Sequence, residues 1–219
     1  ELPAETLKAA LCGIGGVASV CPALARARAL SDRRPAHAVT PERFVTSGAL
    51  PTRGRRRAKL ALYAAAATPE SAALHRHAVG ALQAAGYAVL FIDGMPGLPG
   101  GALPAPESRP PGAEAAEMVL ATDLGGQHIG AWVLALRVLG KAIGGFGQVL
   151  LASDALVGPL GPAAALWTAL DAADGRTRAL AHADPDGTII EAEWLGVPAA
   201  VLAAPPFRAF VESYRFADT

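Results

Sequence analysis

The chain has few cysteines, few aromatic residues and no net charge. Its two cysteines, Cys12 and Cys21, both lie near the N-terminus, which argues against a disulfide framework or a metal site of cysteine spacing. Its 19 basic residues balance its 19 acidic ones, so nothing global points to a nucleic acid or a membrane surface as partner. This composition fits a cytoplasmic protein and leaves membrane association and an oligomer open.

Motifs of several common enzyme classes are absent as well. The sequence has no Gly-x-Ser-x-Gly, no His-Glu-x-x-His and no Cys-x-x-Cys, so it indicates neither a hydrolase of that type nor a zinc site. The Gly-rich string at 12–16 lacks the Lys-Ser/Thr pair of a phosphate loop. The uncharged run at 9–25 is at the lower length limit for a membrane span, and the acidic Glu1 and Glu5 argue against a secretory signal. A half-buried, loosely helical arm is favoured.

Small residues and turn formers are what the chain has in abundance. Hydrophobic residues make up 52% of it, many of them alanine, and there are 24 glycines and 18 prolines. Small alanine side chains suit helices that pack closely on a sheet, and glycine and proline favour tight loops. A chain of 219 residues is long enough for one domain, with or without a short arm.

Residues 1–57 show the weakest pattern and are predicted to form a partly helical N-terminal arm, followed by one domain over 58–219. The arm runs into a basic segment, which is interpreted as a solvated stretch before a strand. An anion or phosphate site and a partner-binding arm are the alternatives. The segment contains Arg53, Arg55, Arg56, Arg57 and Lys59.

From residue 58 onward, buried strands are predicted to alternate with amphipathic helices. Four continuous apolar runs and two weaker ones are predicted as strands: Lys59–Ala64, Tyr87–Asp93, Glu117–Asp123, Gln148–Asp154, Thr177–His182 and Val197–Leu202. Helices are predicted from Thr68 to Gly86 and over Ile129–Ile143, Pro162–Ala173 and Phe207–Tyr214. Such alternation is typical of an α/β fold with a mostly parallel sheet and helices on both faces.

Acidic residues gather at the ends of the predicted strands. Asp93, Asp123 and Asp154 end three strands, and Asp184 and Asp186 follow a later one closely. In open α/β sheets, ligands bind outside the carboxyl ends of the strands. Carboxylates at this edge could coordinate a divalent cation, which would neutralise a diphosphate leaving group. The alternative is that each aspartate only caps the next helix or starts a turn.

A glycine-rich turn precedes the helix at 129–143. Gly125 and Gly126 lie just before His128, and a helix N-terminus with glycines in front presents free N–H groups to an anion. The functional interpretation is a contact with a phosphate or a sugar, and the alternative is a tight turn with an exposed His128. His75 and His77 are two apart on a helix, face different directions and are predicted at the surface.

Four strings of the sequence follow one another in a recognisable order. They are GYAVLFI at 86–92, LGGQHIGAW at 124–132, LLASDALVGPL at 150–160 and the segment 203–214. The first three are similar to the patterns G-[YF]-x-V-[VL]-F-[VI], N-x-G-x-D-x-G-A-W and L-L-x-N-D-S-x-x-G-P-L. The chain therefore resembles, over residues 58–215, the rhamnan synthesis protein F family of bacterial polysaccharide glycosyltransferases.

This resemblance implies a Rossmann-like fold of the GT-A type and a nucleotide-sugar-dependent transferase of cell-surface polysaccharide synthesis. The donor would be a deoxysugar nucleotide such as dTDP-rhamnose, and the acceptor a glycan. Asp154, with Asp123 or Asp93, would hold Mg²⁺ or Mn²⁺ and the donor diphosphate. The turn that contains Gly125, Gly126 and His128 would contact the donor.

The residues at the polar positions of the family patterns bear on whether the chain is an active enzyme or an inactive relative. Asp184 or Asp186 is a candidate, from position alone, for the base that deprotonates the acceptor hydroxyl. The family's acidic residue before Gly-Ala-Trp falls on His128, and the Asn and Ser around its Asp fall on Ser153 and Ala155. A second hypothesis is therefore a catalytically inactive α/β module that acts as a binding or assembly subunit.

Overall fold

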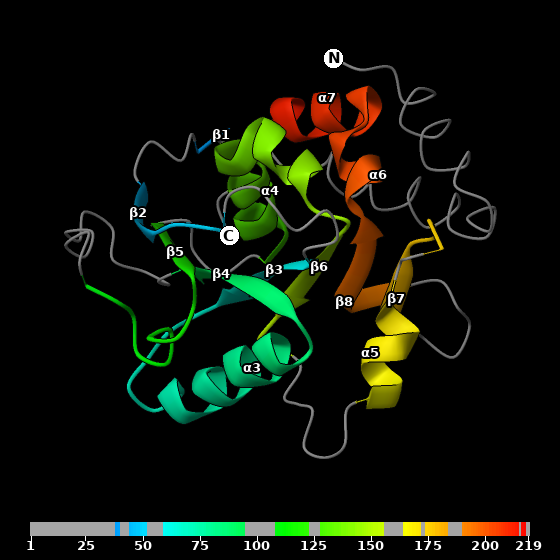
Figure 1. Cartoon of the computed structure of the whole chain (residues 1–219). Coiled ribbons are helices and arrows are strands. Elements are labelled where there is room, and N and C mark those ends of the chain that lie inside the picture. The colour runs from blue at the N-terminus through cyan, green and yellow to red at the C-terminus, as the bar shows by residue number, and fades with distance from the viewer. Residues whose placement is uncertain are drawn as a thin grey trace.

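The computed structural model is an α/β arrangement of one large sheet with helices on both of its faces (Figure 1). It describes residues 38–39, 44–51, 59–94, 108–122, 128–155, 164–171, 174–183, 190–214 and 216–217. In addition to the large sheet, β1 (Ala38–Val39) and β9 (Phe216–Ala217) form an antiparallel two-stranded pair, which joins the two ends of the described chain.

The large sheet has seven strands in the order β2-β5-β4-β3-β6-β8-β7. Their bounds are Phe44–Gly48 (β2), Lys59–Ala65 (β3), Tyr87–Gly94 (β4), Met118–Thr122 (β5), Gln148–Ser153 (β6), Arg178–Ala183 (β7) and Ile190–Pro198 (β8). The predicted strands that begin at Lys59, Tyr87 and Gln148 are confirmed, with ends that differ by about one residue. β5 and β7 likewise confirm the predictions at 117–123 and 177–182.

The sheet is mixed, and the prediction of a mostly parallel sheet holds only for its centre. The central strands β5, β4, β3 and β6 are parallel, whereas β2, β8 and β7 run antiparallel to their neighbours β5, β6 and β8. A parallel crossover needs a dozen or more residues, and only residues 184–189 separate β7 from β8. The short connection therefore dictates the antiparallel pair. β2 adds an edge strand from the range that the sequence assigns to the arm.

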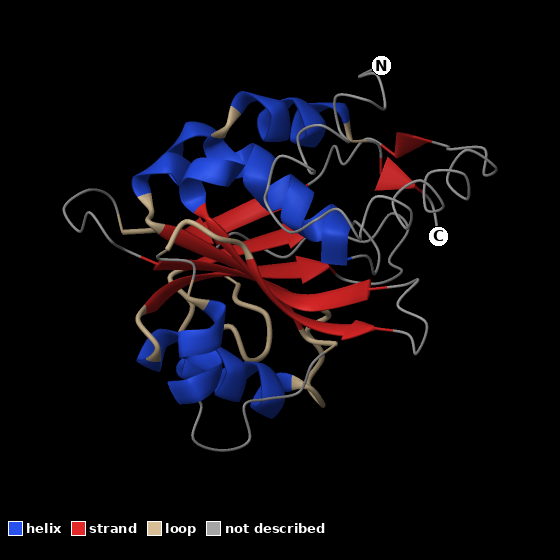
Figure 2. Ribbon diagram, turned by 90° about the vertical axis from the view of Figure 1, so that its right-hand side faces the viewer, coloured by secondary structure: helices blue, strands red, loops and turns tan. Residues whose placement is uncertain are grey.

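Helices cover both faces of the sheet, as predicted (Figure 2). α3 (Ala72–Ala84) and α5 (Ala164–Leu170) lie on one face. The other face carries α4 (His128–Leu139), the 3₁₀ helix η1 (Gly140–Gly145), α6 (Ala199–Ala203) and α7 (Pro205–Ser213). Because both faces are covered, the central strands β3, β4 and β6 are buried along almost their whole length.

α3 begins slightly later than the predicted Thr68. The amide of Thr68 donates to Oγ of Ser71 over 3.0 Å, and the amide of Ser71 donates to Oγ1 of Thr68 over 3.2 Å. This reciprocal pair has the geometry of a capping box, and the regular helix starts at Ala72. At the other end, Gly86 has a φ of 86°, a left-handed conformation that glycine adopts at little cost, so it ends the helix as predicted.

The predicted strand at Val197–Leu202 is confirmed only for its first two residues and is wrong for the rest. β8 ends at Pro198, and α6 begins at Ala199. Pro198 lacks the N–H that would continue a strand ladder, but proline is well tolerated just before a first helical turn. The apolar run over this stretch therefore belongs half to a strand and half to a helix, which a continuous hydrophobic pattern cannot distinguish.

Arg137 joins the C-terminal part of α4 to the end of α7. Its guanidinium donates to the carbonyls of Val211, Glu212 and Tyr214 over 2.8, 3.2 and 2.7 Å. These are carbonyls of the kind that a helix end leaves without an intrahelical partner, so one side chain closes the end of α7. Among the described helices, none combines the length and the apolar character needed to cross a membrane.

Candidate functional site

Two acidic residues flank the carboxyl end of the central strand β3. Asp93 lies near the end of β4, and Asp154 directly follows β6. β4 and β6 are the two neighbours of β3, so the strand order reverses here, and doubly wound sheets bind their ligands at such a switch point. The structure thus brings two of the three predicted strand-end aspartates to one edge.

Asp154 ties three segments of the fold together. Its Oδ2 accepts a hydrogen bond from the amide of Ala66, and its Oδ1 lies next to Nε2 of His128, both over 3.0 Å. Its own amide donates to the carbonyl of Ala64. Burial alone would raise the pKa of Asp154. The pKa is nevertheless lowered, because the carboxylate accepts hydrogen bonds from His128 and Ala66 and is attracted by the positive charge of nearby histidines when they are protonated. Asp154 is therefore a carboxylate at the junction of β3, β6 and α4.

Two tryptophans anchor the end of β6 just before Asp154. Nε1 of Trp132 in α4 donates to the carbonyl of Ala152 over 3.0 Å, and Nε1 of Trp194 in β8 donates to the carbonyl of Ser153 over 3.2 Å. Both indoles are buried, where an indole N–H needs a partner. Because the two partners are consecutive carbonyls, the backbone that carries Asp154 is anchored by a helix and by the neighbouring strand.

Asp93 holds the same turn from the other side of β3. Its Oδ1 accepts a hydrogen bond from the amide of Ala67 over 3.1 Å. Burial raises the pKa of Asp93 to about 6; the bond from Ala67 works against this shift, and the negative charge of Asp154 adds to it. The consecutive amides of Ala66 and Ala67 are therefore bound by two different carboxylates. Only 2% of Asp93 is exposed, so its observed contacts serve to position the turn.

We expect the carboxyl of Asp93 to make the protein less stable as the pH rises from about 4 to about 6. The folded protein keeps this proton up to a pKa of about 6, whereas the unfolded chain releases it near the ordinary value of 3.8. Between these values folding takes up a proton, so the free energy of unfolding falls with rising pH, by about 3 kcal/mol over the full titration.

Urea unfolding across this pH range measures the effect, with Asp93→Asn as the matched variant. Asparagine keeps an oxygen for the amide of Ala67 but does not titrate. The free energies of unfolding of the two proteins should diverge between about pH 4 and 6 and run parallel above. Curves that stay parallel throughout would mean that Asp93 ionises as readily in the folded protein as in the unfolded chain.

His128 is the first residue of α4, and its side chain is 34% exposed. Its Nε2 is bound to Asp154, and its ring centroid lies 6.4 Å from that of Trp132, one helical turn later. The imidazole is thus held from two sides, and the predicted alternative of a merely exposed histidine does not describe it. No hydrogen bond reaches its Nδ1 from the described part of the chain.

His75 is buried, so the prediction that it lies at the surface is wrong, whereas His77 is exposed as predicted. Nδ1 of His75 lies 3.1 Å from the hydroxyl of Tyr63, and Nε2 lies 3.3 Å from the carbonyl of Ala66. His75 of α3 therefore stabilises the turn after β3 through its contact with the carbonyl of Ala66. Its spacing of one helical turn from the apolar Val79 was the signal for the buried face.

The remaining predicted site residues lie outside the described residues. Asp123 is predicted to help Asp154 to hold the cation and the donor diphosphate, and Gly125 and Gly126 to contact the donor. Asp184 or Asp186 is predicted as the base. The roles assigned to them stay predictions.

The family resemblance also implies a divalent cation at Asp154. The described residues contain no group of three or more His, Cys, Asp or Glu side chains that could hold a metal ion. Both oxygens of Asp154 are already engaged, by the amide of Ala66 and by His128. These residues alone therefore do not fit a metal site, and the cation remains a prediction through which no step below is derived.

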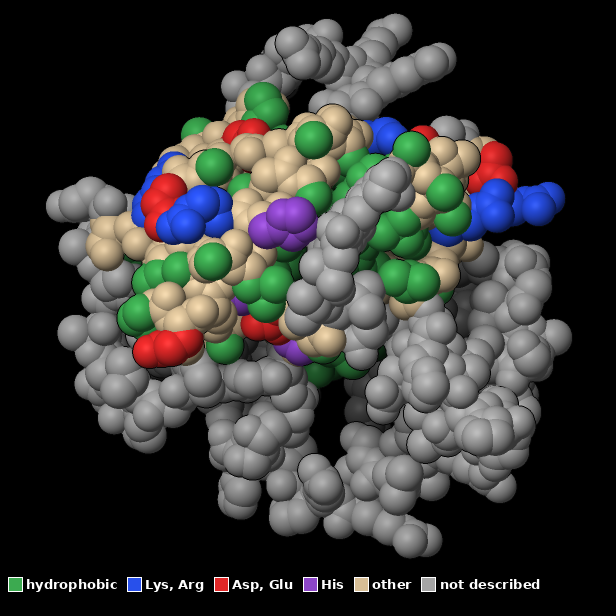
Figure 3. Space-filling model, turned by 90° about the horizontal axis from the view of Figure 1, so that it is seen from below, with side chains coloured by type: hydrophobic (Ala, Val, Ile, Leu, Met, Phe, Trp, Pro, Cys, Tyr) green, Lys and Arg blue, Asp and Glu red, His purple; other side chains and the backbone are tan. Residues whose placement is uncertain are grey.

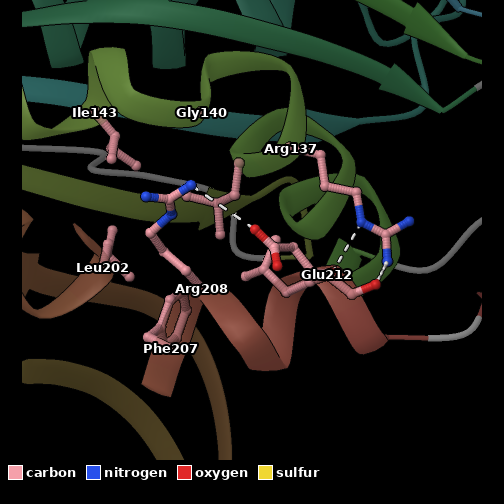
Figure 4. Close-up of a pocket in the computed structure, with 9 residues that line it drawn as sticks. Arg137, Gly140, Ile143, Leu202, Phe207, Arg208 and Glu212 are labelled. Atoms are coloured by element: carbon pink, nitrogen blue, oxygen red, sulfur yellow. Dashed lines mark hydrogen bonds and ion pairs between the residues drawn. The ribbon is translucent and has the colours of Figure 1, made fainter. Parts of the chain in front are cut away.

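A pocket of about 230 Å³ lies at the other end of α4 (Figure 4). Its lining comes from α4, η1, α6 and α7 and consists of Leu136, Arg137, Gly140, Ile143, Leu202, Phe207, Arg208, Val211 and Glu212. Leu136 follows His128 by two helical turns, which places the pocket about 11 Å or more along the helix axis from His128. The pocket is therefore separate from the edge that carries Asp154.

Charges of both signs are interspersed on the face of the molecule that carries α3 (Figure 3). Arg76 of α3, for example, pairs with Glu114 over 3.4 Å. The described residues on this face form no extended basic surface of the kind that nucleic acids require.

Comparison of the chain with family models, with curated proteins and with solved structures found no match. What is known of this edge is therefore the geometry of Asp93, His128 and Asp154.

Proposed function

We propose that the chain is a glycosyltransferase-like protein of cell-surface polysaccharide synthesis, which transfers a (deoxy)sugar such as rhamnose from a nucleotide sugar to a glycan. The observation that carries this proposal is the edge at the switch point of the sheet. There, Asp93 and Asp154 hold the turn after β3, and His128 lies beside Asp154 with part of its ring exposed. Ligands of doubly wound sheets bind outside this edge.

The strings that resemble the family converge on this edge, although they are far apart in the sequence. GYAVLFI forms most of β4 and ends next to Asp93, HIGAW begins α4 at His128, and LLAS ends β6 just before Asp154. Residues that share a chemical task are expected to meet in space, whatever their distance along the chain. This convergence supports a common role for the three strings.

A second candidate function is that of a catalytically inactive module that serves as a binding or assembly subunit. The observation that favours it is the engagement of Asp154, because its amide and histidine partners both belong to the fold. In that case the edge stabilises the domain, and no nucleotide binds there.

Thermal unfolding with nucleotides distinguishes the two functions. We expect dTDP, UDP or GDP at millimolar concentration, with or without Mn²⁺, to raise the Tm by about 3–6 °C. A ligand at about ten times its Kd adds about 1.4 kcal/mol, and 1 kcal/mol corresponds to about 2–4 °C for a chain of this length. If none of the three nucleotides shifts the Tm under either condition, the transferase is rejected and the inactive module remains.

Hydrogen exchange then locates the bound nucleotide. Protection is expected in the turn after β3 and in the first turn of α4, since both lie at the switch point. Residues 136–143 and 207–212, which line the separate pocket, provide the internal control. Protection confined to that control region would contradict a donor site at the edge.

A further inference from the structure

The pair formed by His128 and Asp154 consists of a partly exposed imidazole backed by an oriented carboxylate. Asp154 is held by the amide of Ala66 through Oδ2 and bound to Nε2 of His128 through Oδ1, both over 3.0 Å. The exposed fraction is 34% for the histidine side chain and 21% for the aspartate. The imidazole is therefore partly exposed and is the more exposed group of the pair.

The contact with Asp154 decides which nitrogen of His128 is available. A carboxylate oxygen only accepts hydrogen bonds, so Nε2 must carry the proton that it donates to Oδ1. In a neutral imidazole the lone pair is then on Nδ1, and no group in the described part of the chain binds that atom. This tautomer can take up a proton, and the carboxylate stabilises the imidazolium that results.

We propose that His128 is the base of the transfer reaction and that Asp154 orients it, an inference that rests on the proposed glycosyltransferase function. His128 then takes the role that position along the sequence assigned to Asp184 or Asp186. As the acceptor hydroxyl oxygen bonds to the anomeric carbon of the donor, its proton moves to Nδ1 of His128. The bond between the anomeric carbon and the diphosphate oxygen breaks, the nucleoside diphosphate leaves with the electron pair, and the proton passes to solvent.

A metal ion on Asp154 is the competing arrangement. A cation at Oδ1 would compete with the Nε2–H of His128 for the same oxygen, and it would also repel the imidazolium that the base must become. The dyad and a cation at Oδ1 are therefore alternatives, which a measurement can separate.

NMR of the full chain, labelled with ¹⁵N in histidine, tests the dyad without a substrate. We expect His128 to be the Nε2–H tautomer, with an Nε2 proton protected from exchange, and this protection to disappear in Asp154→Ala, which removes the acceptor. Addition of millimolar Mg²⁺ should leave the signal unchanged. An Nδ1–H tautomer would overturn the proposal, and so would displacement of the Nε2–H signal by Mg²⁺.

A His128→Gln variant separates proton transfer from binding. Glutamine can still donate to Asp154 but cannot accept a proton at neutral pH. We expect dTDP to raise the Tm of the variant as much as that of the wild type, while release of dTDP from dTDP-rhamnose falls about 100-fold or more. If UDP or GDP raises the Tm more than dTDP does, a UDP-sugar or a GDP-sugar is used as the donor in place of dTDP-rhamnose. His77→Gln, at an exposed position of α3, is the matched control with wild-type release.

The outcomes separate a wrong function from a wrong base. If no nucleotide stabilises the wild type, the proposed function fails. If a nucleotide binds but His128→Gln releases it from the donor at the wild-type rate, only the role of His128 is overturned. If the wild type binds the nucleotide but does not cleave its donor, the transfer reaction and the role of His128 are both overturned. Recovery of a His128→Ala variant by added imidazole is expected from a proton-transfer role and is not expected from a structural one.

Discussion

Replacing Asp154 by alanine is expected to lower the free energy of unfolding by about 2–4 kcal/mol. The change removes the acceptor for the amide of Ala66 and for Nε2 of His128. A donor left unpaired in a partly buried place costs about 1–3 kcal/mol, because it has given up water without gaining a partner. The turn after β3, the end of β6 and the start of α4 would lose their common contact. Urea unfolding at neutral pH measures the loss.

Two further variants make this measurement specific. Asp154→Asn keeps the shape and one acceptor, so we expect about half of the loss. Asp174 is an exposed carboxylate that pairs with Arg178 over 2.6 Å, and Asp174→Ala should leave the free energy of unfolding nearly unchanged, because surface ion pairs contribute little. Equal losses in Asp154→Ala and Asp174→Ala would mean that the junction at Asp154 contributes no more than a surface ion pair.

The pKa of Asp93 provides a second readout of the same change. The negative charge of Asp154 contributes to the raised pKa of Asp93. Without that charge the pKa should fall, and the decrease in stability between about pH 4 and 6 should become smaller in Asp154→Asn than in the wild type.

Replacing Gly196 by alanine is expected to lower the free energy of unfolding by about 3 kcal/mol. A Cβ at Gly196 would lie 2.2 Å from the carbonyl oxygen of Leu170 and 3.3 Å from Nε2 of Gln148. Leu170 ends α5, and Nε2 of Gln148 donates to its carbonyl over 2.8 Å. The methyl group would push α5 away from the sheet, which would break this buried hydrogen bond and open the core around Leu170.

Gly80→Ala is the matched control, because a Cβ at Gly80 meets no atom within 4 Å. Gly80 lies inside α3, where alanine is favoured over glycine by about 0.5–1 kcal/mol. The same added methyl group should therefore lower the Tm by about 6–12 °C at Gly196 and raise it by about 1–4 °C at Gly80. A Gly196→Ala protein as stable as the wild type would contradict the close docking of α5 on β8.

The central strands are predictable from the sequence because their burial is a local property of the chain. Each of β3, β4 and β6 is covered by helices on both faces, so the selection for apolar residues acts on every position and leaves a continuous run. The edges of the sheet carry no such signal. β2 is half exposed along its length, and its sequence does not stand out from the arm in which it lies.

The candidate site is predictable only in part. Asp93 and Asp154 are indicated by their position after strands, and His128 by the glycine-rich turn before its helix. The turn at Ala66 and Ala67 has no sequence signal, because it contributes backbone amides rather than side chains. The sequence also assigned His75 to the surface, since a titratable side chain is usually exposed. In the structure, the hydroxyl of Tyr63 and the carbonyl of Ala66 each contact one ring nitrogen of His75, so the ring can be buried without an unpaired polar atom.

By itself, the sequence determined the α/β class, the four central strands and the positions of Asp93 and Asp154 at the ends of β4 and β6. These follow from periodicity and from residues adjacent in the chain, which need no knowledge of distant partners. Only the tertiary structure decided that β4 and β6 lie on either side of β3, that the outer strands run antiparallel, and that His128 meets Asp154. Strand order and long-range hydrogen bonds depend on how separate elements pack together, and local pattern does not encode that choice.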